Sequence, residues 1–209
     1  YKGTANAIYQ NLMFLERFNP KNVLILSGDH IYKMHYGEML KAHKKSGAAI
    51  TIAVMPVPWE EASRFGIMNV DEDGMIVEFE EKPKNPKSNL ASMGIYIFDY
   101  AILKKYLTED ETDPESSNDF GKNIIPAMLK NGEKMMSWKF SDYWKDVGTI
   151  SSLWEANMDL LDVPPKFDIT ERLWNIYSRN KPLAPHYISN GACVKNSTVT
   201  DGCTIKGTV

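Results

Sequence analysis

The sequence predicts an α/β protein with a mixed, mainly parallel sheet, followed by the start of a parallel β-helix. A short apolar run at residues 23–26 ends abruptly at Ser27-Gly28-Asp29, which is typical of a buried parallel strand. Strand and helix patterns then alternate along the chain. From residue 188, small and aliphatic residues recur at five- to six-residue spacing, the periodicity of a β-helix.

The composition is that of an ordinary globular protein, with 43% hydrophobic and 24% charged residues in 209. The net charge of -3 shows no basic excess, so we expect no nucleic-acid partner. No apolar run reaches the roughly 18 residues of a membrane span, so we expect no membrane partner. Cys193 and Cys203 have neither a zinc nor a redox spacing, and they favour a cytoplasmic location.

The N-terminal segment predicts a turn at Gly3-Thr4 and then a helix. Apolar residues at helical spacing (Ile8, Leu12, Leu15 and Phe18) form its buried stripe. Thr4 is the expected N-cap. A Gly-Thr turn at a helix N-terminus also suits a ligand, because free backbone N–H groups there attract anions.

A strand–helix–strand unit follows at residues 23–27, 36–46 and 48–57, with Gly47 ending the helix. The right-handed crossover makes its two strands parallel. Asp29 follows the first strand, where open α/β sheets bind ligands. It is therefore either a ligand- or metal-binding carboxylate or the cap of the next helix.

A hairpin is predicted at residues 66–70 and 75–79 around the Asp73-Gly74 turn. Pro83 ends its second arm, so Glu81 and Lys82 project at the tip as either a binding pair or a solvated charge pair. The strand at 91–98 contains Gly94, which permits close approach of a backbone or ligand.

The remaining chain predicts a helix capped by Asp99 and ending at Leu107, a solvated excursion at 108–118, a helix at 120–130 and a strand at 134–140. Asp146 then precedes a Gly-Thr turn and a helix at 150–161. The buried stripe expected for that helix consists of Leu153, Trp154, Asn157, Leu160 and Leu161. We expect an α/β domain at 1–163, a linker at 164–187 with packed aromatics from Trp174 to Tyr187, and the start of a β-helix at 188–209.

Asp29 and Asp146 each end an apolar strand, and a parallel sheet would bring such ends to one rim. Two carboxylates can hold Mg²⁺ together with substrate phosphates. Lys82 can bind a phosphate as a point charge, and Gly3 and Thr4 supply backbone donors. This combination suits nucleotidyl transfer, which depends on positioning and charge neutralisation. We expect His30 to orient its neighbour or to pack.

Six motifs, in order over essentially the whole chain, resemble the bacterial glucose-1-phosphate adenylyltransferases (ADP-glucose pyrophosphorylases). They are YKGTANA at 1–7, SGDHIYK at 27–33, FGIM at 65–68, EFEEKP at 78–83, ASMGIY at 91–96 and YWKDVGT at 143–149. The resemblance implies a Rossmann-like sugar nucleotidyltransferase domain followed by a left-handed β-helix. It also implies that AMP passes from ATP to glucose 1-phosphate, giving ADP-glucose and pyrophosphate for glycogen or α-glucan synthesis.

Carried onto matching positions, the resemblance makes Asp29 and Asp146 the Mg²⁺ ligands. It makes Lys82 the contact to the phosphate of glucose 1-phosphate and Glu81 the contact to the sugar hydroxyls. Further substrate positions are Tyr1, Gly66, Ser92 and Gly94, and the nucleotide positions are Gly3, Thr4, Ser27, Gly28 and Asp29.

The chain also departs from the family. The glycine-rich loop with its Arg and Lys, and most of the β-helix that carries subunit contacts and much of the effector site, have no counterpart. The chain starts at Tyr1 and stops within a repeat, so we expect a fragment that has no useful turnover alone. Measurable ADP-glucose formation by the isolated chain would contradict this. At full length the resemblance implies an allosteric homotetramer or a heterotetramer with a related subunit.

The sequence also bears on five other interpretations. A non-catalytic regulatory subunit would be expected to lose an Asp or the Lys, yet Asp29, Asp146 and Lys82 are all present. A relative that uses another base is disfavoured by Gly28-Asp29-His30-Ile31-Tyr32-Lys33. A sugar- or nucleotide-binding module stays open, whereas an acyltransferase lacks a His within the repeat. A dehydrogenase lacks a Gly-x-Gly-x-x-Gly turn.

Overall fold

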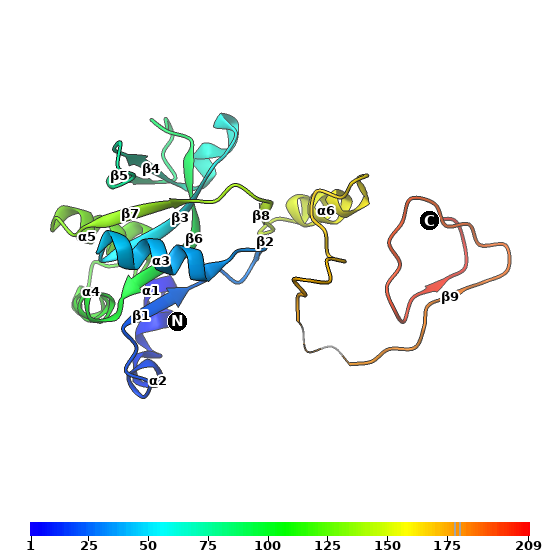
Figure 1. Ribbon diagram of the computed structural model, residues 1–209, viewed down its shortest axis with the longest axis horizontal. Helices are drawn as coiled ribbons and strands as arrows, with labels where there is room; N and C mark the ends of the chain where they lie inside the picture. Colours follow the sequence, from blue (N-terminus) through cyan, green and yellow to red (C-terminus); the bar gives the residue numbers. More distant parts are fainter. Residues whose placement is uncertain (178, 180) are drawn as a thin grey trace. The chain divides into compact units, whose positions relative to one another are not determined.

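The computed structural model describes residues 1–177, 179 and 181–209, and the chain divides into two units (Figure 1). One unit comprises Tyr1–Gly28 and Met34–Ser141, and the other comprises Asp29–Lys33 and Asp142–Val209. Ser178 and Asn180, which belong to the predicted linker, lie outside the described residues.

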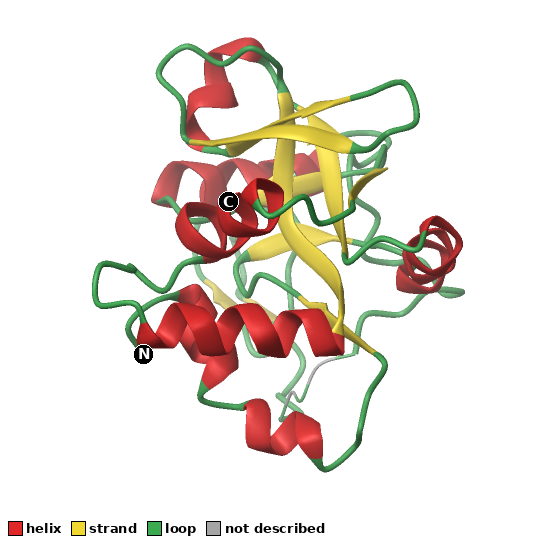
Figure 2. Ribbon diagram, turned by 90° about the vertical axis from the view of Figure 1, so that its left-hand side faces the viewer, coloured by secondary structure: helices red, strands yellow, loops and turns green. Residues whose placement is uncertain are grey.

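The first unit is built on a six-stranded sheet in the order β5-β4-β6-β3-β7, with β1 added alongside β6. The hairpin of β4 and β5 lies at the top of the view in which strands are yellow (Figure 2). The strands are β1 (Asn22–Ile25), β3 (Ile50–Pro56), β4 (Gly66–Val70), β5 (Ile76–Glu81), β6 (Leu90–Asp99) and β7 (Met135–Lys139).

The pairing makes this a mixed sheet, as predicted, but one in which antiparallel neighbours predominate. β6 pairs antiparallel with β1, β3 and β4, and β4 with β5, whereas β3 and β7 pair in parallel. The predicted strand–helix–strand unit does run parallel, because β1 and β3 are both antiparallel to β6. However, β6 lies between them, so the two strands do not exchange hydrogen bonds.

Helices cover both faces of the sheet because side chains alternate along each strand. Ile50, Ile52 and Val54 of β3 join the main core. Thr51 faces the other way, and its hydroxyl lies 2.9 Å from Nδ1 of His43, on α3 (Tyr36–Ser46). The helix α3 ends at Gly47, as predicted, and this residue has a φ of +63°, which favours glycine.

The main core gathers apolar residues of the remaining helices of the first unit. These are α1 (Thr4–Tyr9), α2 (Leu12–Glu16), α4 (Tyr100–Thr112) and α5 (Ile125–Lys130), with a π turn at Phe120–Ile124. A 3₁₀ turn at Trp59–Arg64 precedes β4. Two short helices replace the single predicted N-terminal helix, and Phe18 is 82% exposed rather than part of the stripe.

The segment between α4 and α5 differs from its prediction. Asp99 caps α4 as expected, accepting hydrogen bonds from the amides of Ala101 and Ile102. The helix continues past Leu107 to Thr112, and the predicted solvated excursion ends at a buried residue, Asn118. The Asn118 side chain donates to the Asp110 carboxylate over 2.9 Å, which makes its burial tolerable.

The second unit begins with an antiparallel ribbon of β2 (His30–Tyr32) and β8 (Trp144–Asp146). The helix α6 (Ile150–Met158) follows, with a capping box between Thr149 and Ser152, and a 3₁₀ turn at Asp159–Leu161. The apolar stripe predicted for this helix is wrong. Leu153 and Trp154 are exposed, and the buried residues are Ser152, Ala156 and Asp159.

The end of the second unit contains a short parallel pair, β9 (Tyr187–Ile188) with β10 (Thr204–Ile205). A further parallel bridge joins Cys193 to Thr208. Among the described residues, no helix has both the length and the apolar character needed to cross a bilayer.

Candidate functional site

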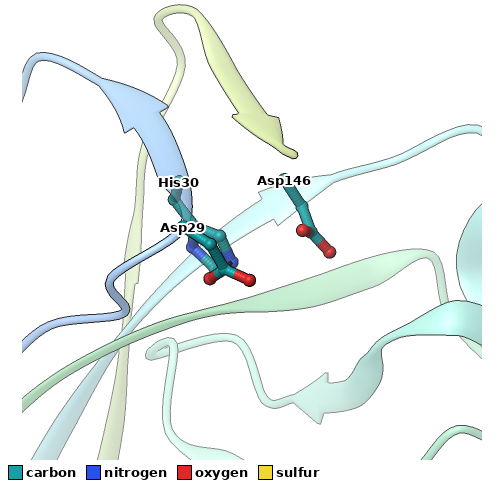
Figure 3. A group of neighbouring side chains, drawn as sticks. All are labelled: Asp29, His30 and Asp146. Atoms are coloured by element: carbon teal, nitrogen blue, oxygen red, sulfur yellow. Dashed lines mark ion pairs between the residues drawn. The ribbon is translucent and has the colours of Figure 1, made fainter. Parts of the chain in front are cut away.

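The ribbon of β2 and β8 brings Asp29 and Asp146 together (Figure 3). His30 pairs with Asp146 in the ladder, and the amide of Val147 donates to the carbonyl of Asp29 over 3.1 Å. One ligand atom each from Asp29, His30 and Asp146 lies within 4.8 Å of the others. The expected proximity of the two carboxylates is confirmed, although an antiparallel ribbon, and not the rim of a parallel sheet, produces it. His35 precedes the next helix as its N-cap, so Asp29 is not the cap.

The third member of this cluster, His30, has two ring contacts. Its Nδ1 accepts a hydrogen bond from Nε1 of Trp144 over 3.4 Å, and the two rings meet edge to face. Its Nε2 lies 3.6 Å from Oδ1 of Asp29. The side chain of His30 is 11% exposed, whereas that of Asp29 is 63% exposed. The imidazole is therefore the fixed member of the cluster, and the Asp29 carboxylate is the freer one.

The donor set suits a divalent cation with oxygen ligands, because two carboxylates face a common space. Gly148 borders that space, and its amide donates to Oδ1 of Asp146 over 2.9 Å. A Cβ at Gly148 would lie 3.1 Å from that oxygen and 3.7 Å from Oδ2 of Asp29. The glycine thus keeps the space beside both carboxylates open.

A second group of candidate residues surrounds Glu81, the last residue of β5. Its ladder partner is Gly66. A Cβ at Gly66 would lie 3.0 Å from Oε2 of Glu81, and a Cβ at Gly121 only 2.5 Å from the same oxygen. Partial burial is the largest influence on the carboxyl and raises the pKa of Glu81; the positive Lys82 opposes this rise, and the negative Asp119 nearby adds to it. Glu81 is therefore held in a confined position.

Tyr96 on β6 lies close enough to Glu81 for the carboxylate charge to act on it, and Ser92 on the same strand hydrogen-bonds Tyr96. Burial raises the pKa of Tyr96 to about 12, a hydrogen bond with Ser92 opposes the rise, and the charges of Glu81 and Asp119 add to it. The hydroxyl of Ser92 also accepts from the amide of Gly94 over 3.3 Å. The structure thus groups the predicted residues Gly66, Glu81, Ser92 and Gly94 in the first unit.

Lys82 follows Glu81 with an unusual backbone. Its φ is +49°, in the left-handed region that non-glycine residues rarely adopt, and Pro83 comes next. Its amide donates to the carbonyl of Phe65 over 3.1 Å, and Nζ lies 3.9 Å from Oε1 of Glu81. The side chain is 64% exposed. Such strain concentrates at functional sites, and here it directs an available ammonium group to the strand tip.

Gly3 and Thr4 have local roles that sequence reasoning missed. A Cβ at Gly3 would collide with the backbone carbonyl oxygens of Ser117 and Asn118, so close packing of two chain segments requires the glycine. The amides of Ala5 and Asn6 already donate to the carbonyl of Asn118. The N-cap of α1 is Gly3, not Thr4 as predicted.

The hydroxyl of Thr4 donates to Oδ2 of Asp119 and accepts from the amide of Phe120, each over 3.0 Å. Asp119 also accepts from the amides of Gly121 and Lys122, which caps the π turn. Thr4 therefore contributes to the position of the Asp119 carboxylate next to Glu81.

Three further predicted residues occupy exposed or open positions. Ser27 donates its hydroxyl to the carbonyl of Gly94 over 3.3 Å. A Cβ added at Gly28 would meet no atom within 4 Å, so packing does not require a glycine there. Tyr1 is 86% exposed, and its hydroxyl accepts from Asn11. The ligand roles of these residues remain predictions.

Sequence reasoning overlooked Tyr96, Asp119, Gly121 and Trp144 as members of these groups. The signal for Asp119 was an acidic residue two positions before a glycine at a helix start. Tyr96 lies four residues after Ser92 on one strand, which places both on the same face. Trp144 lies two residues before Asp146 and shares its face of β8 by the same rule.

Comparison with known proteins now adds to this geometry. Residues 1–163 match the family model described as nucleotidyl transferase. The chain is similar over all 209 residues to glucose-1-phosphate adenylyltransferases of Clostridium beijerinckii and Clostridium acetobutylicum, each at 61% identity, and of Acetivibrio thermocellus at 56%. It covers 54%, 55% and 49% of these proteins respectively, so it spans about half the length of the curated relatives it matches. The resemblance inferred from the motifs is confirmed.

Proposed function

Because the chain belongs to the nucleotidyl transferase family, we propose that its protein catalyses the transfer of AMP from ATP to glucose 1-phosphate, giving ADP-glucose and pyrophosphate. The observation that carries this proposal is the meeting of Asp29 and Asp146, from segments more than a hundred residues apart, on one short ribbon. The ADP-glucose would serve glycogen or α-glucan synthesis.

In the proposed reaction, a phosphate oxygen of glucose 1-phosphate attacks the α-phosphorus of ATP. One phosphorus–oxygen bond forms there, the bond to the bridging oxygen breaks, and pyrophosphate leaves with its electron pair. Asp29 and Asp146 would hold Mg²⁺, which supplies charge neutralisation at the phosphates when bound. The carboxylates themselves fix the position of that charge, and positioning accounts for much of the catalysis.

The Glu81 group suits the sugar phosphate. Lys82 would bind the phosphate through its exposed ammonium group, and Glu81 would accept hydrogen bonds from sugar hydroxyls. Ser92, Gly66 and Gly94 line the same region, and Tyr1 is assigned to the substrate by the family resemblance alone. The confined position of Glu81 supports recognition of one sugar over others.

The nucleotide is assigned to the turn at Gly3 and Thr4 and to Ser27, Gly28 and Asp29. Gly28 supports this assignment best, because the open space on its Cβ side leaves its backbone accessible to a ligand. Gly3 supports it less, because the close approach of the backbone oxygens of Ser117 and Asn118 already explains why a glycine is needed there.

Residues 1–163 are proposed as the catalytic domain, 164–187 as the linker and 188–209 as the start of a left-handed β-helix. The parallel pairing of Tyr187–Ile188 with Thr204–Ile205 supports the last assignment, because parallel coils are the basis of that fold. A cytoplasmic, allosteric tetramer, homomeric or with a related subunit, is proposed from the resemblance.

The test is the forward reaction of the protein at its full natural length, with pyrophosphate release measured from ATP, glucose 1-phosphate and Mg²⁺. Asp146→Asn should lower kcat by about 100-fold or more, the scale of losing one electrostatic stabiliser. Asp142→Asn, at an exposed position four residues earlier, is the matched control and should retain the rate.

Two further measurements distinguish the alternatives. An unchanged rate in Asp29→Asn would favour a regulatory subunit and would contradict the proposed catalytic role. Faster turnover with UTP, dTTP, CTP or GTP than with ATP would overturn the adenylyl assignment while leaving nucleotidyl transfer in place.

A further inference from the structure

We propose that His30 is a positioning residue that holds the Asp29 carboxylate toward the metal, and that it is not itself a metal ligand. The proposal deepens the proposed function, because it rests on the Asp29–Asp146 pair being the metal site. It depends on the contacts of His30 within the β2–β8 ribbon, all of them in the second unit.

The tautomer of His30 follows from its neighbour. The indole Nε1 of Trp144 is a donor only, so Nδ1 of His30 must be the acceptor in their 3.4 Å contact. In the neutral ring the proton therefore resides on Nε2. That nitrogen faces Oδ1 of Asp29 at 3.6 Å and cannot offer a lone pair to a metal while it carries the proton.

The burial of the two side chains shows why Asp29 needs such a neighbour. The imidazole is 11% exposed and is packed edge to face against Trp144, with ring centroids 5.3 Å apart. The Asp29 carboxylate is 63% exposed, and ordering an exposed side chain costs conformational entropy. A fixed N–H dipole beside one oxygen of Asp29 reduces that freedom before the metal binds.

The ladder register adds a second constraint. His30 is paired with Asp146 on one rung, Trp144 is paired with Tyr32 two rungs along, and Asp29 precedes the ladder, where its carbonyl accepts from the amide of Val147. Because the ladder fixes the backbones of His30 and Asp146, we expect a change in the His30–Trp144 contact to act on the side chains and, through Nε2 of His30, on the Asp29 carboxylate. Residues that orient metal ligands typically change metal affinity by 10- to 100-fold when replaced.

The test measures Mn²⁺ binding to the full-length protein by electron paramagnetic resonance, without nucleotide, together with the KM for Mg²⁺ in the forward reaction. His30→Leu should weaken Mn²⁺ binding by about 10- to 100-fold. His30→Gln keeps an N–H donor at a comparable reach and should recover most of the affinity. Trp144→Phe keeps the ring but removes the donor that fixes the tautomer, and it should lie between these two.

His186→Gln, at an exposed histidine elsewhere in the second unit, is the control and should bind Mn²⁺ as the parent does. Thermal unfolding of each variant identifies any that fail to fold. If His30→Leu does not fold, the Mn²⁺ affinities of His30→Gln and Trp144→Phe still test the proposal. His30→Gln keeps a polar side chain at position 30, and Trp144→Phe keeps an aromatic ring at position 144.

Two outcomes would overturn the proposal. If His30→Gln binds Mn²⁺ as weakly as His30→Leu while Trp144→Phe is unaffected, His30 is a ligand. If His30→Leu folds and binds Mn²⁺ as the parent does, His30 only packs. An unchanged Mn²⁺ affinity in Asp146→Asn would instead show that the metal assignment in the proposed function has failed.

Discussion

Glu81 stands at the end of a strand in a six-stranded sheet, whereas Asp29 and Asp146 stand on a ribbon of two three-residue strands. Two glycines lie close beside the first carboxylate, and burial raises its pKa. The other two face open space beside Gly148. The sheet therefore fixes Glu81, the proposed sugar-binding residue, by packing, whereas the proposed metal ligands on the ribbon depend on side-chain contacts.

The largest expected effect tests whether the Glu81 region serves substrate binding while the Asp29–Asp146 ribbon serves the chemical step. Lys82→Ala should raise the KM for glucose 1-phosphate by about 10- to 100-fold, the scale of one charge-assisted hydrogen bond, with a smaller change in kcat. Steady-state kinetics of the full-length protein measures both constants. Lys84→Ala, at an exposed lysine two residues on, is the control. A large fall in kcat with unchanged KM would contradict the division.

The next largest effect is expected on the free energy of unfolding of two glycine variants. Gly3→Ala places a methyl group against the backbone oxygens of Ser117 and Asn118, which cannot rotate away, so we expect a loss of about 1–3 kcal/mol. Chemical denaturation measures it. Gly28→Ala meets no atom within 4 Å and should not destabilise the protein, although it should raise the KM for ATP. Equal losses in both variants would show that the close approach at Gly3 is unimportant.

The pH dependence of stability should have opposite signs in the two units. The folded pKa of Glu81 is raised by burial, so its stabilising contribution is complete below about 4.5 and is lost as the pH rises through the folded pKa. Glu81→Gln removes that loss and should raise the unfolding temperature at neutral pH relative to the parent.

Asp159, in the second unit, should behave in the reverse way. Burial alone would raise the pKa of Asp159, but hydrogen bonds from Lys166 and Tyr143 and the charges of Lys145 and Lys166 together hold it below 3.8. Its contribution is present above that value and is lost as the pH falls through the folded pKa. Asp159→Asn should destabilise at neutral pH but less in acid. Parallel pH profiles for the two variants would contradict the contrast.

The smallest effect compares two glycines that border carboxylates. A Cβ at Gly121 meets Oε2 of Glu81, the flexible end of a side chain, so Gly121→Ala should displace that carboxylate without lowering the unfolding temperature. The KM for glucose 1-phosphate should rise severalfold. Gly148→Ala meets Oδ1 of Asp146 at a longer 3.1 Å and should change the KM for Mg²⁺ instead. Identical kinetic changes would show that the two regions are not separate in function.

Features determined by neighbouring residues were predicted well. The left-handed Gly47, the Asp99 cap and the hairpin around Gly74 depend on the chemistry of a few adjacent positions. Glu81 and Lys82 were placed correctly at the end of the second strand of the hairpin, because Pro83 ends pairing.

Features determined by contacts between distant parts of the sequence were not predicted. β2 and β8 have three residues each, which is too short for the alternation of apolar and polar residues in a strand to be recognised. The ribbon that joins Asp29 to Asp146 could therefore not be inferred. The insertion of β6 between β1 and β3 likewise has no local signal. Ser152 in α6 is buried through the capping box, and Asp159 just after α6 through its lysine contacts, so the buried face differs from the one that hydrophobicity alone predicts.

The position of β6 has a consequence for synthesis on the ribosome. Asn22 of β1 pairs with Asp99, and Ile50 of β3 pairs with Phe98, so both early strands require the last residues of β6 as their partner. Until that segment leaves the exit tunnel, β1 and β3 have no common neighbour, and their apolar residues stay open to chaperones and to other nascent chains. The first unit therefore assembles the centre of its sheet late, when β6 joins strands made long before it, and β7 pairs with β3 only afterwards.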